Sequence, residues 1–178
     1  MRPIVTCAAV AAAGLMTSAA APDRPAEFAC SARGGNYDEI THSGAGQAHR
    51  IRGTVMPLRY RVHDRSRPTA TVQFRIRQPR GGVGLQLLRR GTTDRFDVTI
   101  VTAGSAGGRT STKIGLLGLN QELAFELSAR AGGQVSIQAG DRRVDLPVDV
   151  GTSPEISISC STGAFRFRGL EWGGPPAS

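Results

Sequence analysis

Residues 69–103, TATVQFRIRQPRGGVGLQLLRRGTTDRFDVTIVTA, decide the fold. Apolar and polar side chains alternate over three runs in this stretch: Val72/Phe74/Ile76, Val83/Leu85/Leu87 and Phe96/Val98/Ile100. Successive side chains of a β-strand point to opposite faces, so a period of two is typical of strands that bury one face. Gly81-Gly82 between the first two runs is typical of a turn, because glycine tolerates positive φ. The stretch therefore predicts antiparallel strands joined by short connections.

The same period of two recurs on both sides of this stretch. It covers residues 49–55 and the runs Leu123/Phe125/Leu127, Val135/Ile137, Val144/Leu146, Ile156/Ile158/Cys160 and Phe165/Phe167. Residues 120–130 would also suit a helix, but Gly132-Gly133 links them tightly to the next apolar run, which is a hairpin signal. We predict an all-β, antiparallel β-sandwich of the jelly-roll type with about ten to eleven strands, because many short strands without a sustained helix form two packed sheets.

The ends of the chain differ in composition from its middle. Residues 1–20 combine Arg2, an apolar stretch and small residues up to Ala20, which is the pattern of a secretory signal peptide cleaved near Ala20. The apolar stretch is about a dozen residues and a membrane-spanning helix needs about 17 to 25, so we expect no membrane span. Residues 21–35 would lead into the first strand, residues 36–172 would form the sandwich, and residues 173–178 would form a flexible Gly/Pro-rich tail. The expected location is secreted or periplasmic.

Two cysteines, Cys30 and Cys160, remain once a signal peptide containing Cys7 is removed. Exported proteins meet oxidising conditions, in which a single pair of thiols forms a disulfide by default. We therefore predict a Cys30–Cys160 disulfide that ties the first strand region to the second-last strand. Closing a loop of this length would stabilise the fold by about 4 to 5 kcal/mol through chain entropy. The alternative is two buried free thiols.

Familiar catalytic and cofactor motifs are absent from the sequence. Gly81-Gly82-Val83-Gly84 lacks the lysine of a phosphate-binding loop, and Gly104-Ser105-Ala106-Gly107 lacks the spacing of a nucleophile elbow. His42, His49 and His63 are too far apart to predict a metal site. We therefore predict no catalytic set, no metal and no cofactor.

The net charge of +8 comes almost entirely from arginine, since Lys113 is the only lysine. Arginines two positions apart recur at Arg50/Arg52, Arg59/Arg61, Arg65/Arg67, Arg75/Arg77 and Arg166/Arg168. Residues i and i+2 share a strand face, so these pairs predict a cationic face that binds carboxylate, sulfate or phosphate. The alternative is that the arginine excess reflects GC-rich coding. The shortage of aromatic side chains disfavours both nucleic acid and neutral glycans as partners.

Three short motifs resemble those of the alginate-lyase-like polysaccharide lyases, which are concanavalin A-like jelly rolls. They are Asp38-Glu39-Ile40, Gln73-Phe74-Arg75 and Thr162-Gly163-Ala164-Phe165, within about residues 36–170. The family pattern has a histidine where this chain has Arg75 and a tyrosine where it has Phe165. The resemblance therefore implies the jelly-roll fold without the reactive groups of the lyases. It makes Glu39, Gln73 and Arg75 candidate groove residues rather than catalysts.

The alternation of residues 163–168 conflicts with part of that alignment. If Phe165 faced a groove as the family tyrosine does, Arg166 and Arg168 would point into the core, where unpaired charge is costly. We therefore expect Phe165 to be buried and both arginines to be exposed.

Three functional hypotheses remain. The first is a non-catalytic exported sandwich that binds an acidic polysaccharide through an arginine-bearing face. Its candidate ligand-binding residues are Glu39, Gln73, Arg75 and Arg77. The second is a polysaccharide lyase or hydrolase with another catalytic set, in which Tyr37 or His42 acts as the base and Arg75 neutralises a uronate carboxylate. The third is a structural envelope-interaction domain without a ligand, and the sequence predicts no oligomeric state for any of them.

Overall fold

The computed structural model describes residues 26–33, 35–42, 49–60, 67–76, 81–104, 108–130, 133–151 and 154–173. In chain order its strands are β1 (Glu27–Ser31), β2 (Tyr37–His42), β3 (Arg50–Tyr60), β4 (Thr69–Ile76), β5 (Gly81–Arg89), β6 (Arg95–Ala103), β7 (Arg109–Gly118), β8 (Leu123–Arg130), β9 (Gln134–Ala139), β10 (Arg142–Leu146), β11 (Glu155–Ser161) and β12 (Gly163–Gly173). These described ranges contain no helix, and so none that could cross a membrane.

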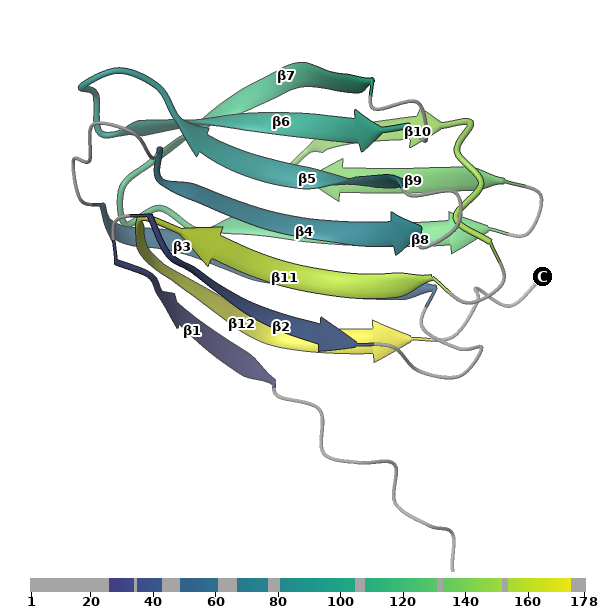
Figure 1. Cartoon of the computed structure of the whole chain (residues 1–178), viewed down its shortest axis with the longest axis horizontal. Coiled ribbons are helices and arrows are strands. Elements are labelled where there is room, and N and C mark those ends of the chain that lie inside the picture. Colours follow the sequence, from purple (N-terminus) through teal and green to yellow (C-terminus); the bar gives the residue numbers. More distant parts are fainter. Residues whose placement is uncertain are drawn as a thin grey trace, which may run out of the picture.

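The strands form two six-stranded antiparallel sheets that lie face to face (Figure 1). The front sheet, nearer the viewer, has the order β2-β11-β4-β5-β6-β7, and the back sheet has the order β1-β12-β3-β8-β9-β10. Paired neighbours such as β12 and β3 are distant in the sequence, as expected of a jelly roll rather than a simple meander. The predicted antiparallel sandwich is therefore confirmed, with twelve strands in place of about ten or eleven.

The alternating apolar side chains fill the space between the sheets. Phe74, Phe96, Phe165 and Phe167 are completely buried there. The ring of Phe96 in the front sheet meets that of Phe165 in the back sheet edge-on, with centroids 5.6 Å apart. Removal of apolar surface from water is the dominant force in folding, so the period-two pattern accounts for the sandwich.

The predicted disulfide joins Cys30 of β1 to Cys160 of β11, with Cα atoms 6.1 Å apart. Strand β1 is the edge of the back sheet and β11 is the second strand of the front sheet, so the bond links the two sheets. Strand β1 lies within residues 21–35, the segment expected to lead into the first strand.

Other local predictions from the sequence have mixed outcomes. Residues 123–130 form strand β8, paired with β9, as the hairpin signal indicated. Gly81 and Gly82, expected in a turn, are the first residues of β5. The sequence pattern also misses β7, because it is a mostly exposed edge strand and a bulge opposite Val98 and Thr99 interrupts its alternation.

The conflict at residues 163–168 is resolved in favour of the alternation. Phe165 is completely buried, whereas the side chains of Arg166 and Arg168 are 34% and 48% exposed. The aligned phenylalanine therefore belongs to the core and not to a groove.

Several predictions concern residues outside those described. They are the signal peptide at residues 1–20, the tail from residue 174 onward, and the side chains of His42, Arg61, His63, Arg65 and Arg77. Gly173, the first residue of the expected tail, belongs to β12.

Candidate functional site

Three of the four predicted binding residues meet on the outer face of the front sheet. Glu39 is on the edge strand β2, Gln73 and Arg75 are on β4, and β11 runs between these two strands. The register pairs Ser159 of β11 with Glu39 on one side and Thr71 on the other. Alternate residues of a strand share a face, so this register places the three candidates on one surface. The fourth, Arg77, lies outside the described residues.

The Glu39 carboxylate is the centre of a hydrogen-bond network. The Tyr37 hydroxyl donates to its Oε2 at 2.7 Å, and the Ser157 hydroxyl and Arg75 Nη2 both reach its Oε1. Arg75 Nη1 also lies 3.6 Å from Glu155 Oε1. The Arg75 guanidinium therefore bridges two carboxylates and is not the free cation that the arginine spacing predicts.

The network sets the protonation states of Glu39 and Tyr37. Burial acts to raise the pKa of Glu39, but the hydrogen bonds from Ser157 and Tyr37 and the charge of Arg75 outweigh it, so this pKa lies below its usual value. The hydrogen bond to the Glu39 carboxylate, in turn, raises the pKa of Tyr37. Near neutral pH the carboxylate is ionised and the phenol is protonated, and neither pKa is close to the value that suits proton exchange with a substrate.

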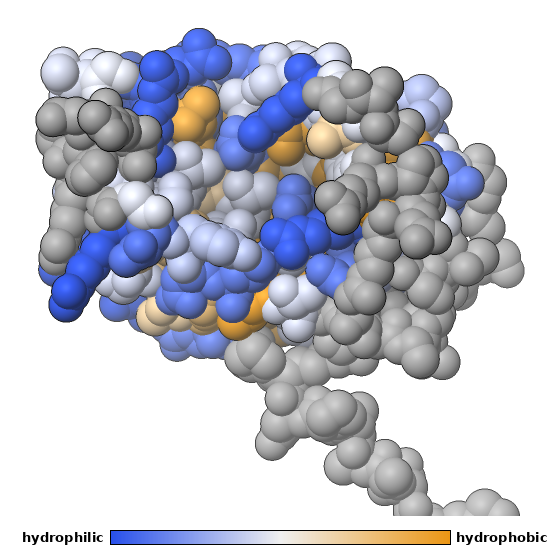
Figure 2. Space-filling model, in the orientation of Figure 1, coloured by the Kyte–Doolittle hydropathy of each residue, from blue (hydrophilic) through white to orange (hydrophobic). Residues whose placement is uncertain are grey.

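A hollow of about 260 Å³ lies beside this network on the same face. We call it the front hollow, and its lining residues are Thr71, Gln73, Gly82, Gln86, Val101, Ala103, Arg109 and Ser159. In the coloured part of this face, Figure 2 shows mainly hydrophilic and neutral side chains, with small hydrophobic areas between them. The combination of a partly apolar surface and a few polar groups is typical of ligand sites.

Two glycines of β5 keep the front hollow open. Gly84 pairs with Gln73 and Gly82 pairs with Arg75, so two positions of the sheet face carry no side chain. A Cβ atom on Gly84 would lie 2.3 Å from the Val72 carbonyl oxygen, closer than any real contact. Glycine is therefore required at this position by the close approach of β4.

The polar wall of the front hollow is a chain of hydrogen bonds. Arg109 Nη2 donates to Gln86 Oε1 at 3.0 Å, and Gln86 Nε2 donates to Thr71 Oγ1 at 3.3 Å. Arg109 is the only charged side chain among the described residues that line this hollow. Sequence reasoning misses it because it misses β7, although Thr110 and Thr112 give that segment a β-branched character typical of strands.

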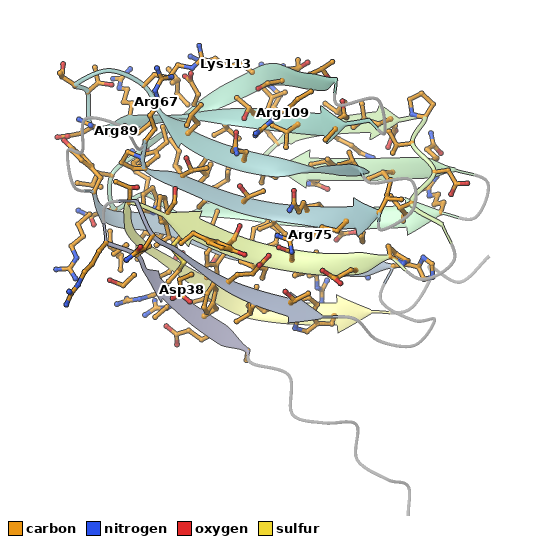
Figure 3. The ribbon with its side chains drawn as sticks, viewed as in Figure 1. Asp38, Arg67, Arg75, Arg89, Arg109 and Lys113 are labelled. Carbon is orange, nitrogen blue, oxygen red and sulfur yellow. A yellow bond between two sulfur atoms is a disulfide. The ribbon has the colours of Figure 1, made fainter. Side chains whose placement is uncertain are left out.

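Arg75 and Arg109 lie on the same sheet face, at β4 and β7 (Figure 3). The register aligns Arg75 with Gly82, Gly82 with Ala103, and Ala103 with Arg109. Three spacings between neighbouring strands place the two arginine Cα atoms about 14 Å apart. Only glycine and alanine stand between them, so the two arginines border an open and uncharged floor.

Two of the arginine pairs of the back sheet, Arg50/Arg52 and Arg166/Arg168, have partners of opposite charge. Arg50 binds Glu126 at 2.8 Å, Arg52 binds Glu171, and both Arg166 and Arg168 approach Glu27. Like-charged neighbours on these strands are thus balanced by carboxylates from the next strand. These arginine pairs do not form the unneutralised cationic face that their spacing predicts.

A larger hollow, of about 540 Å³, lies on the outer face of the back sheet. We call it the back hollow. Its charged lining residues carry both signs, and two of them, Arg52 and Glu171, form an ion pair. The three described binding candidates, Glu39, Gln73 and Arg75, do not line it, and its volume alone gives no chemistry for a ligand. The front hollow is therefore the better candidate site.

The described residues contain no group of three or more His, Cys, Asp or Glu side chains placed to hold a metal ion. Among them, the acidic groups of the candidate face are instead engaged by arginine, lysine and hydroxyl donors, as Asp97 is by Arg90 and Lys113.

No protein-family model matches the sequence, and no curated protein matches it. Solved structures are similar in fold. An alginate lyase from Alteromonas sp. 272 has a TM-score of 0.60 at 9% identity, over 83% of this chain and 86% of that one. An alginate lyase from Pseudomonas aeruginosa has a TM-score of 0.58 at 13% identity, over 73% of this chain and 66% of that one. The carbohydrate-binding module CBM66 from Bacillus subtilis has a TM-score of 0.54 at 12% identity, over 84% of this chain and 96% of that one.

At these identities the likeness concerns the fold. It agrees with the two six-stranded antiparallel sheets and with the resemblance carried by the sequence motifs. The chain has the fold of the concanavalin A-like jelly rolls.

Proposed function

We propose that this chain is an exported, non-catalytic carbohydrate-binding domain whose front hollow holds an acidic polysaccharide. One observation carries the proposal: a small, uncharged floor on the front sheet is bordered by side-chain amides, hydroxyls and two arginines.

The floor and wall of the front hollow suit a sugar ring. A pyranose has apolar C–H faces and a rim of hydroxyl groups, so it needs a flat apolar contact together with donors and acceptors at its edge. Val101 and Ala103 supply the apolar contact. Gln73, Gln86 and Ser159 supply the hydrogen-bond donors and acceptors. The fold is shared with a carbohydrate-binding module and with alginate lyases, which supports a carbohydrate ligand.

Arg109 is the reason for proposing an acidic ligand. Among the described residues its guanidinium bonds to the neutral amide of Gln86 and to no carboxylate. A uronate carboxylate could accept a bidentate, charge-assisted pair of hydrogen bonds from it. Arg75, held by Glu39 and Glu155, would present its remaining polar atoms in a fixed orientation.

The protonation states beside the hollow favour binding over catalysis. A general acid needs a raised carboxyl pKa and a general base needs one near the working pH, whereas the pKa of Glu39 is lowered and that of Tyr37 is raised. A lyase that uses Tyr37 is the second candidate, because this phenol lies next to the Arg75 network. Release of unsaturated uronate products from alginate or polygalacturonate would establish that activity.

Export is proposed from two features. Residues 1–20 have the pattern of a signal peptide, and the disulfide is a bond that persists mainly in oxidising compartments.

Affinity electrophoresis in gels containing alginate, polygalacturonate or a neutral β-glucan tests the ligand class. We expect retardation by the two acidic polymers and not by the neutral one. Arg109→Ala should weaken this retardation about tenfold, because a charge-assisted hydrogen-bonded pair is lost. The matched control is Arg142→Ala, which removes an exposed arginine from β10 of the back sheet.

The control separates a site from general charge attraction. If Arg109→Ala and Arg142→Ala weaken retardation equally, or if the neutral polymer binds as well as the acidic ones, the proposal of an acidic ligand in the front hollow is wrong.

A further inference from the structure

A third hollow lies at one end of the sandwich, away from the front hollow. Its volume is about 320 Å³, and its lining residues are Ser31, Ala32, Arg33, Arg59 and Gly163. We call it the end hollow. Among the described residues, the lining includes two exposed arginines and no acidic side chain, unlike the back hollow, where both signs of charge are present.

Pairing between β1, β12 and β3 builds the end hollow. Ser31 pairs with Ala164, and Ala164 pairs with Arg59, so the arginine stands on the same row as the end of β1. The Ala32 amide then donates to the Gly163 carbonyl oxygen at 2.9 Å, which directs the chain toward Arg33 beyond the strand. Arg59 thus reaches the hollow from β3, and Arg33 reaches it from the segment that follows β1.

The floor of the end hollow depends on a glycine. A Cβ atom on Gly163 would lie 3.1 Å from the Arg59 carbonyl oxygen and 3.2 Å from the Phe165 ring. The neighbouring Thr162 has a φ of 55°, and its buried hydroxyl has no hydrogen-bond partner among the described residues. The β11–β12 turn is therefore tightly constrained next to the hollow.

The disulfide holds the walls of the end hollow in place. Cys30 directly precedes Ser31, and its partner Cys160 lies shortly before the β11–β12 turn that leads to Gly163. A site whose walls are fixed before binding loses less conformational entropy when a ligand arrives.

Arg33 and Arg59 also differ in their partners from the arginines that are neutralised on the sheet faces. Neither forms an ion pair with any other described residue, whereas Arg50, Arg52 and Arg75 all do. Further arginines lie around the same end of the sandwich, including Arg67 and Arg89 (Figure 3). This end of the sandwich therefore carries several arginines, of which Arg33 and Arg59 have no carboxylate partner among the described residues.

We propose that the end hollow is a second binding site, specific for a sulfate or phosphate ester. The guanidinium groups of Arg59 on β3 and of Arg33 after β1 each offer a planar set of hydrogen-bond donors. The three terminal oxygens of a sulfate or phosphate ester can accept hydrogen bonds from both guanidinium groups. The two oxygens of a carboxylate are already occupied by the bidentate hydrogen bonds of one guanidinium group. This site is independent of the front hollow and does not rest on the function proposed for it.

Titration with inorganic phosphate and with dextran sulfate, at constant ionic strength, tests this site. Phosphate should shift the backbone amide signals of Ala32, Arg33 and Gly163 in ¹H–¹⁵N spectra. Arg33→Gln/Arg59→Gln should lower the affinity for dextran sulfate at least about tenfold, since two charge-assisted contacts are lost. The matched control, Arg130→Gln/Arg142→Gln, removes the same charge from exposed arginines on β8 and β10 and should have little effect.

Three results would contradict the proposal of a binding site in the end hollow. They are equal losses in the two double variants, phosphate shifts that do not centre on the end hollow, and a polygalacturonate affinity that falls as much as the dextran sulfate affinity. Melting temperatures of both double variants verify that each is folded. Ala103→Leu, which fills the front hollow, should leave the binding of dextran sulfate at the end hollow unchanged, so failure at one hollow is distinguishable from failure at the other.

Discussion

At the residue scale, Arg75 is held between two carboxylates on the outer face of the front sheet. The sequence identifies Glu39, Gln73 and Arg75 as residues that share a surface, and the structure places them on one face. It cannot identify Ser157 and Glu155 as the partners of Glu39 and Arg75, because those contacts depend on the register of β11 against β2 and β4. A periodic pattern predicts which residues of a strand share a face, but it does not predict which strand pairs with it or in which register.

The lowered pKa of Glu39 predicts how stability depends on pH. A carboxyl group whose pKa falls on folding stabilises the protein above its unfolded pKa, and this contribution disappears as pH falls through the lower folded pKa. Glu39→Gln should therefore lower the free energy of unfolding by about 1 to 3 kcal/mol at pH 7. The difference from the unmodified protein should shrink as pH falls below about 4.5, the ordinary value for a glutamate.

Urea denaturation at a series of pH values from 7 to 2.5 measures this difference. The matched control is Glu122→Gln, an exposed glutamate with no ion pair among the described residues, which should change stability little at any pH. A Glu39→Gln effect that stays constant over the whole range would contradict the ionised network.

At the element scale, the front hollow is formed by the way the strands pair, and it could not be predicted from the composition of any single strand. The sequence predicts the alternating strands, the β8–β9 hairpin and the buried Phe165 correctly. It misses β7, and with it Arg109, because an exposed edge strand with a bulge has no clean period of two. The sequence pattern also assigns Gly81-Gly82 to a turn, although both residues belong to β5. A sequence alone does not distinguish a glycine required by close contact between strands from a glycine required by a positive φ.

Gly84 gives the sharpest test at this scale. A Cβ atom there would lie 2.3 Å from the Val72 carbonyl oxygen and 2.7 Å from the Gln73 Cα, so β4 and β5 would have to separate. Gly84→Ala should therefore lower the free energy of unfolding by at least about 2 kcal/mol, as overpacking does. Chemical denaturation measures the change.

Gly108→Ala is the control for this substitution. A Cβ atom on Gly108 would have no other atom within 4 Å, and the residue has no positive φ, so alanine should be tolerated there. If Gly84→Ala is as stable as Gly108→Ala, the close pairing of β4 and β5 beneath the front hollow is wrong.

At the scale of the whole molecule, the positive charge is distributed unevenly. The pairs Arg50/Arg52 and Arg166/Arg168 of the back sheet are neutralised by glutamates, whereas Arg109 and the arginines of the end hollow have no carboxylate partners among the described residues. Composition alone gives the size of the net charge. The location of the unbalanced charge depends on which acidic residues the fold brings next to each arginine, and these residues are distant in the sequence.

The disulfide is also a property of the whole molecule, because it links the two sheets across 130 positions of sequence. Cys30→Ser/Cys160→Ser should lower the free energy of unfolding by about 4 to 5 kcal/mol, since the unfolded chain regains the entropy of an open loop. Guanidinium denaturation of the oxidised protein and of the double variant measures the difference. Equal midpoints would mean that the bond does not constrain the unfolded chain.

The central claim is that the front hollow, and not the larger back hollow, binds the carbohydrate. Calorimetric titration with alginate oligosaccharides of the unmodified protein, Ala103→Leu and Ala124→Leu tests it directly. Ala103 is exposed in the front hollow and Ala124 is exposed in the back hollow, so the two variants add the same side chain to opposite faces. We predict that Ala103→Leu abolishes binding and that Ala124→Leu leaves it unchanged. The reverse pattern, or unchanged binding by both variants, would contradict the account.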